Sequence, residues 1–415
     1  MYIAMASSYE YAIYNKVVLQ SLFDNNQDSR ITVYFGYIDD RLEPYIDEWN
    51  TYFSYTGNKI LGVKIPEQYV DFGIDTMAWN PVTYARHAMF NLLPEEIERI
   101  MYLGTNILVT KNIKELYHMD LKGKTIAGPR LFDNFELEEN KAWMKNRVLP
   151  TIERTALKGV DVDNWVVGSI LIIDMLRWRR FFNYEKFFDS IKTHPFKFLD
   201  EEALNYVFKE DKLAFTEEVY NAVTQHEDEE KAINRAKIIH YGGPTKGWNN
   251  YGMSPEGNLW WEYAKKTDQY EELLKRATSN LWNIIKSNQE KQMYKYQIFE
   301  KYVNLKGQGI FFENLKKHNL KNLVIYGNTS FSKYVCKDLR EYGINIEAVV
   351  DGYDVTSGES LLVHEFLNNY ELYSNADGIL IILPYDVAKR IYNFLKKVSF
   401  LQLPIWDIEG MLEIC

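Results

Sequence analysis

Ile-Met-Tyr-Leu-Gly-Thr-Asn-Ile-Leu-Val, residues Ile100–Val109, is the stretch around which the other segments of this sequence can be arranged. The apolar residues on both sides predict a buried strand, and Gly104–Asn106 interrupts it with a small and polar step. An α/β enzyme commonly holds a ligand or a metal at such a break, because the backbone can approach it closely. The alternative interpretation is a strand that ends in a turn and then restarts.

The composition is that of a folded globular protein. The 415 residues suffice for two domains, or for one large and one smaller domain, and 46% apolar with 15% aromatic residues supply sizeable cores. The net charge of -10 is spread along the chain, and lysine and arginine form no long block. A basic nucleic-acid surface is therefore excluded, and no nucleic-acid partner is expected.

Cysteine usage and the lack of long apolar runs indicate the compartment. Only Cys336 and Cys415 are present, which excludes a disulfide framework and a cysteine-based metal cluster and fits a reducing compartment. The chain opens directly into Tyr2–Ala6, and no run approaches the roughly 20 apolar residues of a membrane span. We expect a cytoplasmic protein without a transmembrane segment, with peripheral membrane association as the alternative.

The first residues predict a βαβ unit. Tyr2–Ala6 is expected to be a strand, Tyr11–Phe23 a helix and Ile31–Tyr37 a second strand. In such a unit the loop after the first strand faces the ligand crevice. The loop residues that can contact a nucleotide are Ser7, Ser8 and Glu10. Ordinary helix N-cap residues would give the same pattern.

A charged residue interrupts the apolar stripe of the next predicted helix. Asn80–Glu96 is expected to be helical after Pro81 and to end near Pro94. Arg86 lies four residues from both Val82 and Phe90, so its charge falls on an apolar face. Such a cation needs an anionic partner, which is either a carboxylate of the protein or a phosphate of a ligand.

Two later segments carry candidate sugar-binding groups. Asp163–Asp174 predicts a buried strand, in which Gly168 permits close approach to the backbone. Phe198–Asn205 contains three consecutive carboxylates at a helix N-terminus, where the helix dipole favours negative charge. Helix capping alone explains them, but Asp200 and Glu201 in a crevice can also orient sugar hydroxyls or stabilise a cationic transition state.

The segment Ile238–Trp248 is the sharpest local signature. A short apolar strand delivers His240, a Gly-Gly-Pro turn that includes Gly243 reverses the chain, and Lys246 follows six residues after the histidine. The histidine suits a metal or a phosphate, and the lysine suits phosphate charge. The alternative for the histidine is a core residue with satisfied hydrogen bonds.

Taken together in this order, the segments resemble glycosyltransferase family 8 over roughly residues 1 to 265. The resemblance implies a GT-A fold, a nucleotide-sugar donor that is usually a UDP-hexose, and transfer with retention of anomeric configuration. It also implies a glycan or lipid-linked acceptor and a place in polysaccharide biosynthesis. The matching motifs are Thr83–Arg86, Leu92–Pro94, Tyr102–Leu103 with Val109, Gly168 before Ile-Leu-Ile-Ile-Asp, Asp200–Asn205 and His240–Trp248.

The resemblance also implies roles for single residues. Family members hold Mn²⁺ on an Asp-x-Asp motif and on the histidine that matches His240, and the lysine that matches Lys246 contacts the diphosphate. Arg86 would steady the donor, while Asp200 and Glu201 would hold the sugar and flank the reacting carbon. The remaining residues expected at the donor are Ser7, Ser8, Glu10, Thr105, Asn106 and Gly243.

This sequence departs from the family at the metal motif. The Asp-x-Asp positions are Gly104, Thr105 and Asn106, so both carboxylates are missing. Hard divalent cations depend on carboxylate charge, and one histidine with one amide does not replace it. Mn²⁺ is therefore expected from the resemblance but disfavoured by these residues.

The C-terminal part changes in character. Residues 266–318 predict a helical connector, and residues 319–415 predict a smaller Rossmann-like α/β domain. Asp351 ends a predicted strand where dinucleotide sites place a ribose-binding carboxylate, but Gly327–Ser332 lacks the Gly-x-Gly-x-x-Gly pattern. A docking or oligomerisation module is the favoured interpretation, and nucleotide binding is the alternative.

The sequence therefore predicts a hexosyltransferase of the GT-A fold with a second, smaller Rossmann-like domain. The alternative from another class is a catalytically inactive relative that binds or scaffolds an active glycosyltransferase, since the metal ligands are lost. A third interpretation is a module that senses sugars or nucleotides. The pair His240 and Lys246 favours the enzyme.

Overall fold

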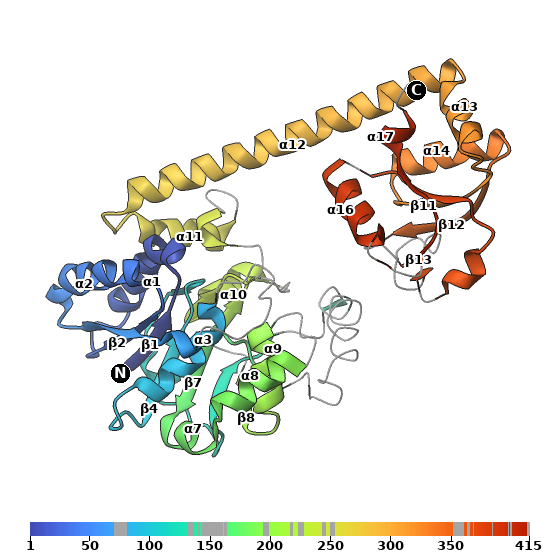
Figure 1. Ribbon diagram of the computed structural model, residues 1–415. Helices are drawn as coiled ribbons and strands as arrows, with labels where there is room; N and C mark the ends of the chain where they lie inside the picture. Colours follow the sequence, from blue (N-terminus) through green and yellow to red (C-terminus); the bar gives the residue numbers. More distant parts are fainter. Residues whose placement is uncertain are drawn as a thin grey trace. The chain divides into compact units, whose positions relative to one another are not determined.

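The computed structural model forms two compact units, Met1–Ser279 and Asn280–Cys415, and the helix α12 (Tyr270–Gly307) runs from one into the other (Figure 1). Each unit has its own sheet and its own core. The structure describes residues 1–69, 81–131, 137–138, 142, 161, 164–193, 199–215, 219–222, 228–242, 246–249, 254–351, 361–362, 366–367, 369–383, 385–396, 398 and 401–412.

A seven-stranded sheet organises the first unit. Its strands lie in the order β3 (Lys59–Lys64), β2 (Thr32–Tyr37), β1 (Tyr2–Ala6), β4 (Arg99–Leu103), β7 (Ile170–Asp174), β6 (Ile126–Pro129) and β8 (Lys212–Phe215). β7 runs antiparallel to both of its neighbours, whereas the other pairs are parallel. The loops after β1 and β4 consequently leave from the same edge of the sheet.

Helices cover both faces of this sheet (Figure 1). Side chains alternate along β1, so that Ile3 and Met5 face one side and Ala4 and Ala6 the other. The first side packs against α1 (Ala12–Asp24) and α2 (Glu43–Tyr52). The second side packs against α3 (Val82–Met89), α7 (Met175–Phe181), α8 (Tyr184–Thr193) and α9 (Leu199–Val207). The shorter helices of this unit are α4 (Lys114–Tyr117), α10 (Glu229–Arg235) and the 3₁₀ turns Tyr9–Tyr11, Asp40–Leu42, Ser54–Thr56, Glu67–Tyr69, Phe90–Leu92 and Gly247–Asn249.

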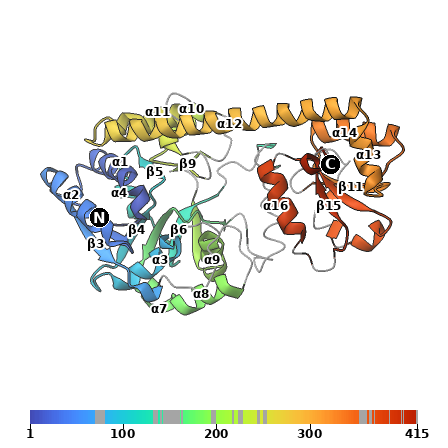
Figure 2. The same ribbon diagram turned by 45° about the horizontal axis from the view of Figure 1, so that its top comes forward.

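A small second sheet explains why α1 is buried on every side. β5 (Ile107–Val109) pairs antiparallel with β10 (Ile238–His240), which pairs parallel with β9 (Val219–Asn221). This sheet shares a core with α1 and α11 (Pro255–Ala264), and Figure 2 shows these elements together. A helix that is covered by two sheets has no exposed face, which is why even the polar side chains of α1 up to Ser21 are buried: Asn15, Lys16, Gln20 and Ser21.

The structure corrects the prediction of one strand over Ile100–Val109. The strand ends at Leu103, and the chain restarts at Ile107 in the second sheet. The polar step Gly104–Asn106 is the crossing between the two sheets, so the strand does end and restart there, while ligand binding at the step stays a prediction. The strand predicted over Asp163–Asp174 is also too long, because only Ile170–Asp174 is extended in the sheet and Gly168 lies in the turn before it.

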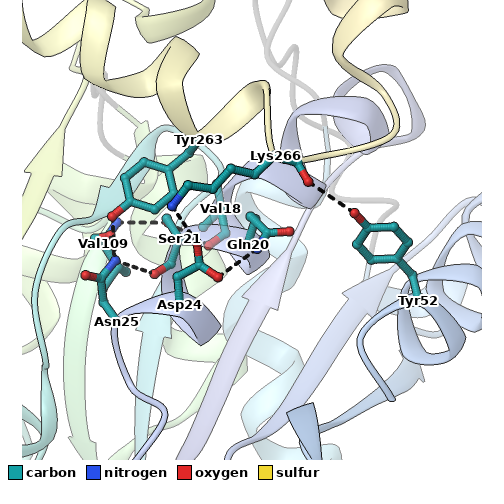
Figure 3. A network of polar contacts seen from close by, with 9 residues as sticks. All are labelled: Val18, Gln20, Ser21, Asp24, Asn25, Tyr52, Val109, Tyr263 and Lys266. Carbon is teal, nitrogen blue, oxygen red and sulfur yellow. Dashed lines mark hydrogen bonds and ion pairs between the residues drawn. The ribbon is translucent and has the colours of Figure 1, made fainter. Parts of the chain in front are cut away.

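Polar contacts tie the end of α11 and the residues that follow it to the ends of α1 and α2 (Figure 3). Asn25 Nδ2 donates to Tyr263 Oη at 2.6 Å, and Lys266 Nζ lies 2.8 Å from Asp24 Oδ2. Tyr52 Oη donates to the Lys266 carbonyl oxygen at 3.2 Å. These contacts hold the chain on the first unit as far as the start of α12, while the division at residues 265 and 318 stays a prediction.

The second unit contains a parallel five-stranded sheet with helices around it, as predicted for a Rossmann-like domain. The strand order is β13 (Leu361–Leu362), β12 (Asn345–Asp351), β11 (Asn322–Tyr326), β14 (Gly378–Ile381) and β15 (Ile405–Asp407). The helices are α13 (Ile310–Lys317), α14 (Ser330–Glu341), α16 (Tyr385–Lys396) and α17 (Ile408–Met411), with a 3₁₀ turn at Tyr370–Tyr373. The fold class is thus confirmed for both units.

The loop after β11 shows how this unit uses its candidate ribose-binding group. Gly327 has φ of 119°, and a Cβ there would lie 2.7 Å from the Ile382 carbonyl oxygen. Asp351 Oδ2 accepts a hydrogen bond from the Asn328 amide at 2.7 Å, so the carboxylate supports the loop. Thr329 caps α14 through a reciprocal pair of bonds with Ser332, which uses amides that a phosphate would otherwise need.

Candidate functional site

The first candidate loop lies at the carboxyl end of β1, beside the end of β4. Ser7 and Ser8 are buried there, whereas Glu10 is exposed. Ser7 Oγ donates to the Ser8 carbonyl oxygen at 2.9 Å, so it stiffens the loop. Ser8 stands at the N-cap position of the following 3₁₀ turn, but its side chain makes no capping hydrogen bond. The N-cap alternative therefore explains where Ser8 lies, but its side chain does not cap the turn.

Asn106 and His240 lie in contact across the two strands of the second sheet. Asn106 Nδ2 is 3.1 Å from the Tyr241 carbonyl oxygen, which can only accept, so the amide nitrogen must face this side. The same Nδ2 lies 3.2 Å from His240 Nε2, which must therefore be the unprotonated, accepting nitrogen. The predicted neighbourhood of the polar step and the histidine turn is thus confirmed. Thr105 lies in the same turn, and Gly243 lies outside the described residues.

Lys246 lies next to this pair. Its Nζ donates to the same Tyr241 carbonyl oxygen at 3.1 Å, and no carboxylate of the described residues pairs with it. Burial lowers the pKa of Lys246 to about 8, and burial together with the Lys246 charge lowers the pKa of His240 to about 3. Lys246 is thus a partly buried cation without a carboxylate partner among the described residues, and such a place favours an anion.

A second group of residues surrounds Asp200 at the start of α9. The Arg86 guanidinium forms an ion pair with Asp200 Oδ2 and stacks 4.7 Å above the Tyr102 ring. His87 Nε2 lies 3.4 Å from the same carboxylate oxygen. The anionic partner expected for Arg86 is therefore a carboxylate of the protein.

Burial would by itself raise the pKa of Asp200, but the charge of Arg86 and the hydrogen bond from His87 outweigh it and lower this pKa. Burial alone would lower the pKa of Arg86, but the interactions with Asp200 and Tyr102 outweigh burial and raise this pKa. Asp200 is thus ionised, and no described residue donates to its second oxygen, Oδ1. That oxygen can accept from a ligand.

Glu201 differs from Asp200 in its bonding. Its Oε1 accepts from Trp165 Nε1 at 3.0 Å, and its Oε2 accepts from the Gly168 amide at 3.1 Å. Burial raises the pKa of Glu201, while these two donors oppose the rise. The carboxylate therefore holds the turn before β7 in place. A Cβ at Gly168 would lie 3.0 Å from an Arg86 nitrogen, which explains why the turn carries a glycine there.

The turn before β7 connects the two groups. Gly168 is bound to Glu201, and the carbonyl oxygen of the next residue, Ser169, accepts from the Gly104 amide at 2.8 Å. The polar step and the carboxylates are therefore joined through two consecutive residues. The structure thus brings Asn106, His240 and Lys246 into one group and Arg86, Asp200 and Glu201 into a second group, and the turn before β7 links the two.

Sequence reasoning missed three contributors. His87 follows Arg86 directly, and nothing in that spacing indicates that both side chains reach one carboxylate. Trp165 was hidden inside a segment interpreted as a strand. The Tyr11 ring is 40% exposed beside the first loop and lies 5.9 Å from the Trp248 ring, close in sequence to Lys246. An exposed aromatic residue after the first strand was the available signal.

The residues at the Asp-x-Asp positions do not fit the Mn²⁺ that the resemblance implies. Gly104 offers no side-chain ligand, and the lone pair of His240 Nε2 is used by Asn106. Within the described ranges, no three His, Cys, Asp or Glu side chains form a metal-binding group. A search of the described helices finds none with the length and hydropathy of a membrane span.

Comparisons with known proteins point to one family. The family model for glycosyl transferase family 8 matches residues 2–252. Glycosyltransferase GlyF of Streptococcus pneumoniae is 24% identical over 306 residues, which cover 70% of this chain and 67% of GlyF. Lipopolysaccharide 1,2-glucosyltransferase of Escherichia coli is 23% identical over 192 residues. The match covers 43% of this chain and about half (53%) of that enzyme.

The structure of galactosyltransferase LgtC with donor and acceptor sugar analogs covers 66% of this chain and all of LgtC, with a TM-score of 0.53 at 17% identity. A likeness of this kind concerns the fold, and it identifies the first unit as GT-A. The match of the family model over more than half of the chain then settles the family. This chain belongs to glycosyltransferase family 8.

Proposed function

We propose that the chain transfers a hexose from a nucleotide-sugar, with UDP-hexose as the donor, to a glycan or lipid-linked acceptor with retention. The family supports sugar transfer, and the names of the relatives, which include a glucosyltransferase and a galactosyltransferase, support a hexose. Cytoplasmic polysaccharide synthesis is the setting that we propose, with the second unit serving docking or oligomerisation.

Each of the two groups of the site would contact a different part of the donor. Lys246 would face the diphosphate, since its ammonium group supplies positive charge, and the Asn106 amide would lie beside it. Tyr11 would stack on the base, because an accessible aromatic ring binds any base by its face. Asp200 would accept from a sugar hydroxyl through Oδ1, while Glu201 positions the turn that separates sugar and diphosphate.

One observation carries this proposal: the turn before β7 links the polar step beside Lys246, which has no carboxylate partner in the described chain, to Glu201, the neighbour of the ionised Asp200. A structural lysine at this depth would be paired. A diphosphate and a sugar, which are joined in one molecule, would satisfy both groups at once.

The test is UDP-hexose affinity by calorimetry for the wild type and Lys246→Ala. A charge-assisted hydrogen bond contributes about 1.5–3 kcal/mol, so we expect affinity to fall roughly ten- to a hundredfold at an unchanged melting temperature. Lys231→Ala, at an exposed position in α10, is the matched control and should bind like the wild type. Equal affinity of Lys246→Ala and wild type would contradict the proposal.

The second candidate is an inactive relative that binds an active glycosyltransferase. The loss of both carboxylates at Gly104 and Asn106 favours it, because family members use them in the reaction. This candidate predicts no nucleotide-sugar binding by the wild type, so the same titration separates the two functions.

A further inference from the structure

The site around Asn106 has an unusual set of groups for a place where the family holds a metal ion. The side chains that meet there are an amide, an imidazole and an ammonium group. The amide donates to the imidazole, and the amide and the ammonium group share one backbone acceptor, the Tyr241 carbonyl oxygen. No carboxylate takes part among the described residues. The electrostatic character of the site is therefore positive where a metal site would be negative.

The Asn106 amide occupies the direction in which a ligated metal would have to lie. Its Nδ2 carries two protons, and these are directed at His240 Nε2 and at the Tyr241 carbonyl oxygen. A cation bound to Nε2 would have to displace this N–H group. The bond of the Tyr241 amide to the Asn106 carbonyl oxygen, 2.8 Å long, fixes the backbone on both sides of the pair.

The other motif position is closed by packing. A Cβ at Gly104 would lie 3.0 Å from Asn106 Oδ1 and 3.3 Å from both Cβ and the carbonyl oxygen of Ser169. A carboxylate at residue 104 would therefore require the turn before β7 to shift. Since Glu201 holds that turn through Gly168, the closure depends on the acidic group as well.

We propose that this site binds the donor diphosphate without a divalent cation, because the Asn106 amide occupies the place of the metal and Lys246 supplies the charge. The inference rests on the proposed function, because it assumes that a nucleoside diphosphate enters the crevice. His240 then acts as a positioning residue, which orients the amide by accepting from it.

The test uses UDP as the probe, titrated into the full-length protein in EDTA and again in excess MnCl₂. The wild type should bind with affinities that agree within about twofold. Asn106→Asp should weaken binding in EDTA by about tenfold or more, because a carboxylate would face the phosphates. His240→Gln should stay within about threefold of the wild type, since the glutamine oxygen can also accept from Asn106. Melting temperatures confirm that each variant is folded.

The outcomes distinguish failure of the metal-free site from failure of the proposed function. If the wild type binds UDP at least tenfold more tightly with Mn²⁺, the metal-free site is wrong and the proposed function stands. Asn106→Asp binding as tightly as the wild type in EDTA, or His240→Gln losing affinity as a metal ligand would, also overturns the metal-free site. If the wild type binds UDP in neither buffer, both proposals fail.

Discussion

His87 Nε2 lies 3.4 Å from Asp200 Oδ2, the same oxygen that pairs with Arg86. Two consecutive residues of α3 thus hold one buried carboxylate, and they do so from one side. No described residue donates to the other oxygen, Oδ1. The ion pair thus offsets the cost of burying the charge and leaves one oxygen able to accept a further hydrogen bond.

Removing the Arg86 cation should therefore destabilise the folded protein. Arg86→Met leaves the Asp200 carboxylate buried without its charge partner, and we expect a loss of about 3–5 kcal/mol in the free energy of unfolding by urea titration. The double variant Arg86→Met/Asp200→Asn should recover part of this loss. Arg41→Met is the control, because its ion pair with Asp39 is exposed, and it should cost less than about 1 kcal/mol. A loss as small as the control's would contradict this account.

Acid should destabilise the protein through His87. Burial lowers its pKa from 6.5 to about 4, so the unfolded state binds the proton first as the pH falls. The contribution of neutral His87 to the free energy of unfolding is fully present above pH 6.5 and is lost progressively as the pH falls to about 4. Since one pKa unit corresponds to about 1.4 kcal/mol, the wild type should lose about 3 kcal/mol more than His87→Gln over this window. Urea titrations at several pH values measure it, and the exposed His118→Gln should follow the wild type.

Glu201→Gln tests whether this carboxylate holds the turn. Both of its oxygens accept, so an amide must direct its NH₂ group at Trp165 Nε1 or at the Gly168 amide. We expect a loss of about 1–3 kcal/mol in stability together with weaker donor binding. Trp165→Phe, which removes one donor, should give a smaller loss of the same kind. An unchanged melting temperature for Glu201→Gln would mean that the residue serves only the substrate.

Tyr11→Ala should separate base recognition from phosphate recognition. Stacking on one base contributes about 1–3 kcal/mol, so UDP affinity should fall by that amount while pyrophosphate affinity stays the same. Tyr55→Ala removes another exposed ring, 74% accessible, and serves as the control. Equal losses for UDP and pyrophosphate would show that the ring shapes the loop instead of stacking on the base.

The sequence predicted elements well where one local pattern was sufficient. β1 begins and ends at the predicted residues Tyr2 and Ala6, because a short apolar run bounded by Ser7 leaves little choice. The polar step and the histidine turn were correctly expected to meet.

The rest depended on contacts between distant residues. Arg86 and Asp200 are 114 residues apart, so the sequence could state only that the arginine needs an anion. Ile100–Val109 has the same apolar character on both sides of its break, and only pairing with β1 and β10 distinguishes its two strands. Both oxygens of Glu201 accept hydrogen bonds from the protein, whereas only one oxygen of Asp200 does so among the described residues. This difference depends on donors that are distant in the sequence.

The buried Lys16 sets a practical limit on shortening this protein. Its side chain is fully buried in α1, and its Nζ lies 2.5 Å from Glu48 Oε1 and 2.7 Å from Asp268 Oδ1. A chain cut at residue 252, where the family match ends, or at residue 265 would lose Asp268 and open the lysine to water. A catalytic fragment prepared for crystallisation or inhibitor screening should therefore extend to Ser279, where the first unit ends.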